Sequence, residues 1–429
     1  MIHTCEECGR QSSSGDIWLW CKPCNAQHFK QQFDSWSSEN KVIDEFIQET
    51  QLNASNHFQK LEWIKYEKFT DVKYLSKGGF GKVYVATWKE GYIYKWNVEK
   101  QDWSRRYELL GETKVVLKSL NNSKNIPAGF FDEIKHQINS LDAGIKGGYR
   151  IIPCYGITKD PTSEDFIMVM RFAEEGNLRK YLDNKFYSLD WYQRFKILHS
   201  ILKGLNHIHN AGLTHQDLHG GNIVMFELED ASITDFGLCK PITQYPEEKK
   251  KSVFGVLPYI APEVLRGEEY SQSSDVYSFG ILMNEIATGL PPYNDIPHNN
   301  ELAVEIIQGR RPPTDARITP QLFIQLLERC WDAKPENRPI SQELIYQFDK
   351  WFGILNTKEY DDFWNQVEEI ENRKKESLES IPNSPTILES KINYVTHSQA
   401  IYSSRLFNFP IFPPAKNAHE AVQNTPGKL

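Results

Sequence analysis

Hydrophobic and polar positions divide the chain into segments with different periodicities. In residues 31–65 apolar side chains recur at helical intervals among polar ones, which predicts a helical linker. Residues 66–353 carry strand patterns first and helix patterns later, and residues 354–380 hold Glu and Lys at helical spacing. The stretch 381–429 has Pro, Ser and Asn but little periodicity. We therefore expect one large domain, then a charged helix, then a mostly disordered tail.

Three stretches inside residues 66–353 have clear patterns. Residues 75–88, LSKGGFGKVYVATW, alternate around a glycine cluster and predict a hairpin. Residues 89–114 predict an extended hairpin around Trp96 and Trp103, which is either a lengthened connection or a surface for a protein partner. In the helical stretch 188–212, four apolar residues share one face: Phe195, Leu198, Leu202 and Leu205.

The composition is that of a globular protein. The chain has 429 residues, of which 40% are hydrophobic and 25% charged, enough for one large domain or two to three smaller ones. A net charge of −8 argues against nucleic-acid binding as the main activity. No apolar run approaches the roughly 18 residues of a membrane span, and the first residues lack a secretory-signal layout. We expect an intracellular, cytoplasmic protein, with a nuclear location not excluded, that binds neither nucleic acid nor membranes.

Four of the seven cysteines lie at the start of the chain, as two Cys-x2-Cys pairs twelve residues apart: Cys5, Cys8, Cys21 and Cys24. Such pairs can supply four thiolates to one structural Zn²⁺, so residues 1–30 predict a zinc-ribbon module. Gly9 supports a knuckle that needs positive φ, and the run 17–20 resembles a short ribbon strand. Two redox pairs or unrelated thiols are the alternatives. Zinc here would indicate a fold rather than a function.

The glycine cluster offers a place for phosphate, because backbone N–H groups can approach phosphate oxygens where no side chain intervenes. Alone, such a cluster often marks only a turn. The candidate residues around it are Leu75, Ser76, Lys77, Gly78, Gly79, Phe80, Gly81, Lys82 and Val83.

Chemically capable residues then follow in a fixed order. Lys118 closes the apolar strand VVLKSL, and Glu133 follows on a helical stretch; seen alone, these could be an exposed Lys and an unrelated surface Glu. HQDLHGGN supplies Asp217 and Asn222, and TDFG supplies Asp235. Further along come Glu263 in APE, Asp275 on a helix capped by Ser273 or Ser274, and Arg338 in NRP.

This ordered set resembles the eukaryotic protein kinases over residues 66–353. The resemblance implies an α+β, two-lobed fold, with a small antiparallel β lobe that carries helix αC and a larger α-helical lobe. The HQDLHGGN and DVYSFG styles look like the tyrosine-kinase-like group. Together with the Cys quartet, FDSWSSEN and the tail THSQAIYSSRLFNF, the chain resembles a large kinase family expanded in mycorrhizal fungi.

The resemblance implies roles for individual residues. Lys118 would hold the α- and β-phosphates of ATP and pair with Glu133, and Asp217 would orient the attacking hydroxyl. Asn222 and Asp235 would bind Mg²⁺ or Mn²⁺. The catalytic set would then be Asp217, Lys118 and Asn222. The adenine site would involve Val116, the gatekeeper Met170, the hinge from Arg171 to Ala173, and Val224. Glu263 and Arg338 would form a buried ion pair, and Asp275 would hold the catalytic-loop backbone.

Several positions depart from the kinase pattern. Ser76 replaces the first glycine, and Val116 replaces an alanine above the adenine site. Gln216 replaces the Arg that receives an activation-loop phosphate, so phosphorylation of that loop would lack its usual cation. His219 replaces a Lys and Val256 replaces its Thr partner; His219 could supply charge if protonated or one hydrogen bond if neutral. The candidate loop residues are Thr243, Tyr245 and Ser252, beside lysines 249–251, with Lys240 as the nearest substitute cation.

The sequence therefore predicts an ATP-dependent protein kinase in signal transduction, which phosphorylates protein hydroxyls, Ser or Thr rather than Tyr. Two alternatives stay open. One is a weak or inactive pseudokinase scaffold that still binds ATP, and the other is a zinc-ribbon binding protein with a secondary kinase-like part.

Overall fold

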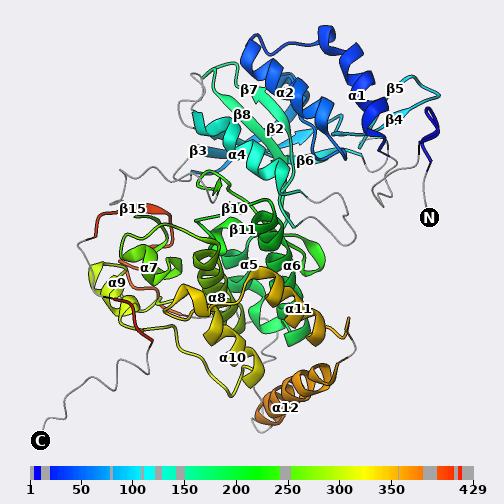
Figure 1. Cartoon of the computed structure of the whole chain (residues 1–429). Coiled ribbons are helices and arrows are strands. Elements are labelled where there is room, and N and C mark those ends of the chain that lie inside the picture. Colours follow the sequence, from blue (N-terminus) through cyan, green and yellow to red (C-terminus); the bar gives the residue numbers. More distant parts are fainter. Residues whose placement is uncertain are drawn as a thin grey trace, which may run out of the picture. The chain divides into compact units, whose positions relative to one another are not determined.

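The computed structural model divides the chain into two compact units (Figure 1). The first comprises Met1–Ala173 and Asp235–Gly237, and the second comprises Glu174–Thr234 and Leu238–Leu429. The structure describes residues 4–10, 20–77, 81–106, 108, 111–120, 128–141, 150–241, 253–355, 357–379, 394–409 and 414–417. The predicted features that lie outside these residues are Gly78, Gly79 and Phe80, ribbon residues 17–19, most of the tail, and the loop residues Thr243, Tyr245, Ser252 and 249–251.

A six-stranded sheet forms the centre of the first unit, in the order β1-β7-β8-β6-β3-β2. Its strands are β1 (Glu62–Trp63), β2 (Phe69–Lys77), β3 (Gly81–Trp88), β6 (Thr113–Leu120), β7 (Cys154–Lys159) and β8 (Phe166–Arg171). Neighbouring strands are antiparallel, except that β1 runs parallel to β7. The strands within residues 66–353 thus form the antiparallel β lobe that the kinase resemblance implied. Strand β1, from before residue 66, adds one parallel pairing, so the whole sheet is mixed.

Strand β1 comes from the segment predicted as a helical linker. Glu62 lies opposite Gly156, where a Cβ would stand only 2.1 Å from the Glu62 carbonyl oxygen, so glycine is needed for this approach. The buried Glu62 carboxylate pairs with Lys60 and, at 2.9 Å, with Arg105. The strand thus depends on partners distant in the sequence, which local periodicity does not reveal.

Two helices precede the strands of this sheet in the sequence, and a hairpin lies between β3 and β6. Helix α1 spans Lys22–Gln31, α2 spans Lys41–Asn53, and the hairpin pairs β4 (Ile93–Asn97) with β5 (Asp102–Arg105). The Asn40 side chain caps α2 by accepting hydrogen bonds from two backbone N–H groups. The hairpin predicted for residues 89–114 is therefore confirmed.

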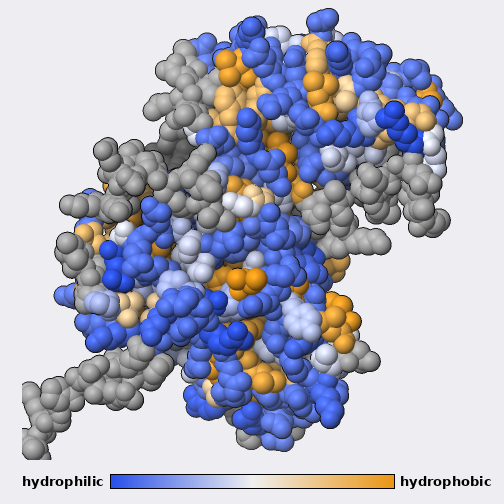
Figure 2. Space-filling model, viewed as in Figure 1, coloured by the Kyte–Doolittle hydropathy of each residue, from blue (hydrophilic) through white to orange (hydrophobic). Residues whose placement is uncertain are grey.

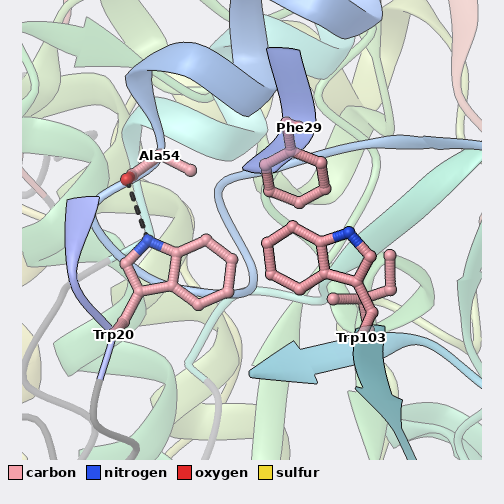
Figure 3. Close-up of a cluster of buried hydrophobic side chains, with 5 residues drawn as sticks. Trp20, Phe29, Ala54 and Trp103 are labelled. Atoms are coloured by element: carbon pink, nitrogen blue, oxygen red, sulfur yellow. Dashed lines mark hydrogen bonds between the residues drawn. The ribbon is translucent and has the colours of Figure 1, made fainter. Parts of the chain in front are cut away.

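An aromatic cluster joins the hairpin to the N-terminal helices (Figure 3). Trp103 stacks on Phe29, with ring centroids 4.1 Å apart, and lies 6.2 Å from the ring of Trp20. The Trp20 indole N–H donates to the Ala54 carbonyl over 3.0 Å. Trp103 of the hairpin, considered in the sequence as part of a partner surface, is thus buried inside the first unit.

Helices make up most of the second unit. They are α5 (Leu178–Lys185), α6 (Trp191–Asn210), α7 (Pro262–Leu265), α8 (Gln272–Thr288), α9 (Asn300–Ile307), α10 (Gln321–Cys330), α11 (Ser341–Trp351) and α12 (Lys358–Glu379). Short strands accompany them: β9 (Gly176–Asn177), β10 (Leu213–Thr214), β11 (Ile223–Met225), β12 (Ala231–Ile233), β13 (Lys240–Pro241), β14 (Val253–Gly255) and β15 (Arg405–Phe407). They pair as β10–β13, β12–β11–β9 and β14–β15.

The two longest core helices of this unit illustrate how sequence determines their ends. Helix α6 begins at a capping box formed by Asp190 and Gln193, and its four predicted core residues are fully buried. Helix α8 begins with a capping box between Ser271 and Ser274 and ends at Gly289, whose φ is +75°. The cap predicted at Ser273 or Ser274 was therefore wrong, because the helix starts earlier than the apolar pattern suggested.

Residues 394–409 contain a short strand within the stretch that the sequence predicts to be a mostly disordered tail. We call them the tail segment. Strand β15 pairs with β14, and the Tyr394 hydroxyl donates to Asp183 over 2.9 Å. Backbone pairing and a few side chains hold the segment in place. Because it does not bury one face of a helix or strand, its sequence shows no amphipathic period.

On the face drawn in Figure 2, hydrophilic residues predominate and hydrophobic ones form small separate patches. Within the described residues, every helix is too short or too polar to cross a membrane.

Candidate active site

Lys118 is the centre of a charged cluster in the first unit. It lies in β6, between Val83 of β3 and Met168 of β8. Its ammonium donates to Glu133 Oε1 over 2.7 Å and to Asp235 Oδ1 over 2.9 Å. The predicted pairing of Lys118 with Glu133 is confirmed, and Asp235 joins the same cluster.

Glu133 reaches this cluster because of the helix that carries it. Helix α4 spans Ala128–Asn139 and buries Phe130, Ile134 and Ile138, which share one face at intervals of four residues. Glu133, next to Ile134, is also buried, and its side chain is 5% exposed. The apolar face of α4 therefore fixes the position of the carboxylate.

The cluster contains two carboxylates and one ammonium. Burial alone would lower the pKa of Lys118, but Asp235 and Glu133 outweigh burial and raise that pKa above its usual value. Burial raises the pKa of Glu133, and Lys118 opposes this effect. Asp235 keeps 24% of its side chain exposed and has a φ of +67°, in the left-handed region that functional sites often tolerate. A charged Lys beside a partly exposed carboxylate fits a site for phosphate and a divalent cation.

Most of the described residues predicted to surround the nucleotide lie in strands β2, β3, β6 and β8 of the first unit. Glu133 lies on α4, Ala173 follows β8, and Val224 belongs to the second unit. Val116 is opposite Met170 in the β6–β8 ladder, and Ala173 is buried near the end of the unit. Ser76 is opposite Val83, and Lys77 is opposite Lys82, in the antiparallel pairing of β2 with β3. The remaining members of this set with described backbone are Leu75, Lys77, Gly81, Lys82 and Arg171 in the sheet of the first unit, and Val224 in β11 of the second.

The second unit contains Asp217 and Asn222 in close contact. Asn222 Nδ2 donates to the backbone oxygen of Asp217 over 2.9 Å and to its Oδ2 over 3.2 Å. The Asn222 backbone oxygen accepts a hydrogen bond from Thr234 N over 2.9 Å. The amide nitrogen of Asn222 thus fixes the Asp217 carboxylate, and the amide oxygen is the atom suited to a cation.

Asp275 holds the backbone of this loop, as predicted. Its Oδ2 accepts from His215 N over 2.8 Å, and its Oδ1 accepts from Gln216 N over 2.9 Å. His209 lies 3.1 Å from the same carboxylate, which is a structural contact. Gln216 has a φ of +69°, and its side-chain amide donates to Thr214 Oγ1 over 2.9 Å. Two hydrogen bonds to one carboxylate therefore stabilise a strained turn immediately before Asp217.

His219 faces the Asp217 carboxylate. Its Nδ1 accepts a hydrogen bond from Gly221 N over 3.1 Å, so the proton of the neutral ring belongs on Nε2. Nε2 lies 3.7 Å from Asp217 Oδ2 and 3.4 Å from the hydroxyl of Ser404. Gly221 N therefore occupies Nδ1, and Nε2 is the His219 atom directed at Asp217 and Ser404.

Glu263 and Arg338 form the predicted buried ion pair. The guanidinium donates to both carboxylate oxygens, each over 2.7 Å, and the Arg338 side chain is 0% exposed. It also donates to the carbonyls of Asp332 and Ser273. Four hydrogen bonds from Arg338 thus stabilise a part of the second unit that lies outside the catalytic loop.

Sequence reasoning missed Ser404. Its hydroxyl donates to Asp217 Oδ2 over 2.6 Å. The available signal was the group of apolar and aromatic residues within a polar tail, which includes Tyr402, Leu406 and Phe407.

The four N-terminal cysteines form a separate candidate metal centre. Their sulfur atoms all lie within 4.8 Å of one another, with Cys5 to Cys24 at 3.9 Å and Cys8 to Cys21 at 3.7 Å. A tetrahedron with Zn–S bonds of about 2.3 Å has sulfur–sulfur edges of roughly 3.8 Å. Gly9 has a φ of +68°, as the knuckle required. The second pair lies at the start of α1, with Cys21 as its N-cap.

Comparison with known proteins identifies the family. Residues 69–348 match the family model described as protein tyrosine and serine/threonine kinase. A probable serine/threonine-protein kinase of Dictyostelium discoideum is 26% identical over 327 residues, 72% of this chain and 17% of that protein. The receptor-interacting serine/threonine-protein kinase 4 of Homo sapiens is 29% identical over 290 residues, 64% and 31% respectively. The Mus musculus protein of the same name is 32% identical over 205 residues, which are 45% of this chain and 25% of that protein. The chain thus spans less than a third of these relatives.

Proposed function

Because this chain belongs to the family of protein tyrosine and serine/threonine kinases, we propose that it transfers the γ-phosphate of ATP to a hydroxyl group of a protein, in signal transduction. The observation that carries this proposal is the buried Lys118 ammonium held between Glu133 and Asp235. A cation fixed in this way serves phosphate recognition, since its position no longer depends on the ligand.

Each unit supplies part of the proposed chemistry. In the first unit, Lys118 donates hydrogen bonds to phosphate oxygens while Glu133 keeps it in place. The kinase motifs assign Asp235 and Asn222 as ligands for Mg²⁺, which would neutralise charge on the phosphates when it is bound. The partly exposed Asp235 carboxylate and the amide oxygen of Asn222 are the hard oxygen ligands that Mg²⁺ prefers.

Asp217 acts on the acceptor. Its carboxylate accepts the hydroxyl proton and aims the hydroxyl oxygen, and Asn222 holds that carboxylate in one orientation. His219 places its Nε2 3.7 Å from the same oxygen, in the position where the family pattern has a Lys. The departures from that pattern therefore leave all the acidic groups and the phosphate-binding cation in place, and we do not favour the pseudokinase alternative.

The finer assignments rest on the names of relatives, on motifs and on the cysteine pattern. The names of the three relatives favour serine and threonine over tyrosine as acceptors. The motif styles in the sequence support the tyrosine-kinase-like group and the kinase family expanded in mycorrhizal fungi. The cysteine pattern of the sequence, which does not form a disulfide framework, supports a reducing, cytoplasmic location.

We also propose that one structural Zn²⁺ binds the four N-terminal cysteines. The sulfur spacing fits a tetrahedron, and α1 carries both a ligand pair and Phe29 of the aromatic cluster. Zinc would then stabilise the packing of α1 on the hairpin, without taking part in phosphate transfer.

Transfer of labelled γ-phosphate to a general protein acceptor such as dephosphorylated casein tests the proposed kinase activity. The wild-type chain should label the acceptor in the presence of Mg²⁺, and Asp217→Asn should lose nearly all labelling while it still binds ATP. Labelling that is equal in the two proteins would contradict the role of Asp217. ATP binding without any transfer by the wild type would restore the pseudokinase alternative.

A further inference from the structure

The hydroxyl of Ser404 occupies the position that an acceptor hydroxyl needs. It donates to Asp217 Oδ2 over 2.6 Å and lies 3.4 Å from His219 Nε2. A general base must approach the proton that it removes to about 2.6–3.2 Å between heavy atoms. The short bond to a carboxylate is also the charge-assisted type. Ser404 therefore meets the distance requirement for proton transfer to Asp217.

Backbone pairing places the residue beside this carboxylate. β15 pairs antiparallel with β14, with Arg405 opposite Gly255 and Phe407 opposite Val253. Gly255 has a φ of +148°, and a Cβ built there would lie 3.5 Å from Asp217 Oδ1. The end of β14 thus lies directly against the catalytic carboxylate. An extended peptide added to such an edge is a recurrent mode of peptide recognition.

Contacts on both sides of Ser404 hold the tail segment in this register. The Tyr402 hydroxyl donates to the Pro292 carbonyl over 2.9 Å, and its ring lies edge-on to His298 with centroids 4.8 Å apart. His298 N donates to the Gln399 carbonyl over 3.0 Å. On the other side, Arg405 donates to the His298 carbonyl over 2.6 Å. Ser404 is thus positioned by its neighbours as well as by its own hydroxyl.

We propose that the tail segment is a substrate of its own catalytic loop and that Ser404 is the residue phosphorylated, within the same molecule. This inference rests on the proposed kinase function. The Ser404 hydroxyl gives its proton to Asp217, and its oxygen forms a bond to the γ-phosphorus of ATP. The bond between that phosphorus and the β–γ bridging oxygen breaks, and ADP leaves with the electron pair. The products are phosphoserine at position 404 and ADP.

The same register favours a short aliphatic hydroxyl. The hydroxyl of a tyrosine at position 404 would lie farther from the backbone by the length of the ring. It would therefore extend beyond Asp217 Oδ2. Tyr402, two residues away, instead directs its hydroxyl to the Pro292 carbonyl. Acceptors that pair with β14 in this way are therefore serine or threonine peptides. Since the segment belongs to the same chain, it also competes with external acceptors at a high effective concentration.

The experiment maps phosphate by mass spectrometry in the full chain, after phosphatase treatment and repurification followed by incubation with Mg²⁺ and ATP. We expect phosphate on Ser404 at a rate per molecule that stays constant over roughly a hundredfold range of protein concentration, as an intramolecular reaction requires. Ser404→Ala should abolish this phosphate and Ser404→Thr should retain it. The matched control is Ser403→Ala, because Ser403 is exposed and adjacent to Ser404. This substitution should leave the phosphorylation of Ser404 unchanged.

Casein labelling, measured in parallel, separates the possible failures. Casein labelled while Ser404 stays unmodified would overturn this inference and leave the proposed function intact. A rate per molecule that rises in proportion to concentration would overturn the intramolecular reaction. Label on neither casein nor Ser404 would overturn both proposals.

Discussion

Removing Arg338 should destabilise the second unit strongly. In the variant Arg338→Met, the Glu263 carboxylate would stay buried without its cation, and the carbonyls of Asp332 and Ser273 would lose a donor. Methionine has a similar length and no charge, so the change isolates the guanidinium.

The magnitude follows from burial. Breaking a buried ion pair by removing one partner costs about 3–5 kcal/mol, because the remaining charge is left uncompensated. For a domain of about 150–250 residues, each kcal/mol lowers Tm by about 2–4 °C. We therefore expect the melting temperature of the second unit to fall by about 6–20 °C.

Differential scanning calorimetry of the full chain measures this change. The matched control is Arg317→Met, since Arg317 also pairs with a carboxylate, Asp315, but its side chain is 84% exposed. Exposed pairs contribute about 0–1 kcal/mol, so the control should change Tm by no more than about 4 °C. The double variant Glu263→Gln with Arg338→Met should recover part of the loss. Equal effects of Arg338→Met and Arg317→Met would refute the reasoning.

Three further predictions concern the metal centre, regulation and pH. Protein purified without chelator should contain one zinc per chain by elemental analysis, and chelation should change the fluorescence of the Trp20–Trp103 cluster; metal-free protein with that cluster intact would contradict the zinc proposal. Phosphatase treatment should change turnover on casein by less than about tenfold, or about 1.4 kcal/mol, because Gln216 replaces the phosphate-receiving Arg, and Gln216→Arg should make turnover sensitive. A larger effect in the wild type would mean that another cation binds the phosphate. Burial and Lys60 lower the pKa of His57 to about 3, so the unfolded state binds more protons below about pH 6.5 and the first unit should lose stability there as pH falls. His57→Phe should flatten this dependence in pH-dependent melts, whereas an unchanged slope would assign it to other groups.

Motif order made much of the site predictable. The contact between Lys118 and Glu133, the hold of Asp275 on the loop and the Glu263–Arg338 pair each depend on residue types whose order and approximate spacing the sequence displays. The pairing of distant segments was not predictable in this way.

Strand β1 and the tail segment show the reason. β1 is two residues long, and its Glu62 is buried only because Arg105 and Lys60 compensate its charge. β15 is held by backbone hydrogen bonds, which do not depend on residue type and so leave no pattern in the sequence. Ser404 is one of many polar residues in the tail. Hydrophobic periodicity reports which face of an element is buried, and neither segment buries such a face.

We propose that the chain catalyses phosphate transfer with Asp235 as a ligand for Mg²⁺. Its most direct test measures Mg²⁺-dependent labelling of casein by wild type, Asp235→Ala and Asp361→Ala, the last of which alters an exposed carboxylate on α12. We expect wild type and Asp361→Ala to label casein equally, and Asp235→Ala to lose at least about a hundredfold, or about 2.7 kcal/mol in the barrier. Labelling by Asp235→Ala at the wild-type rate would contradict it.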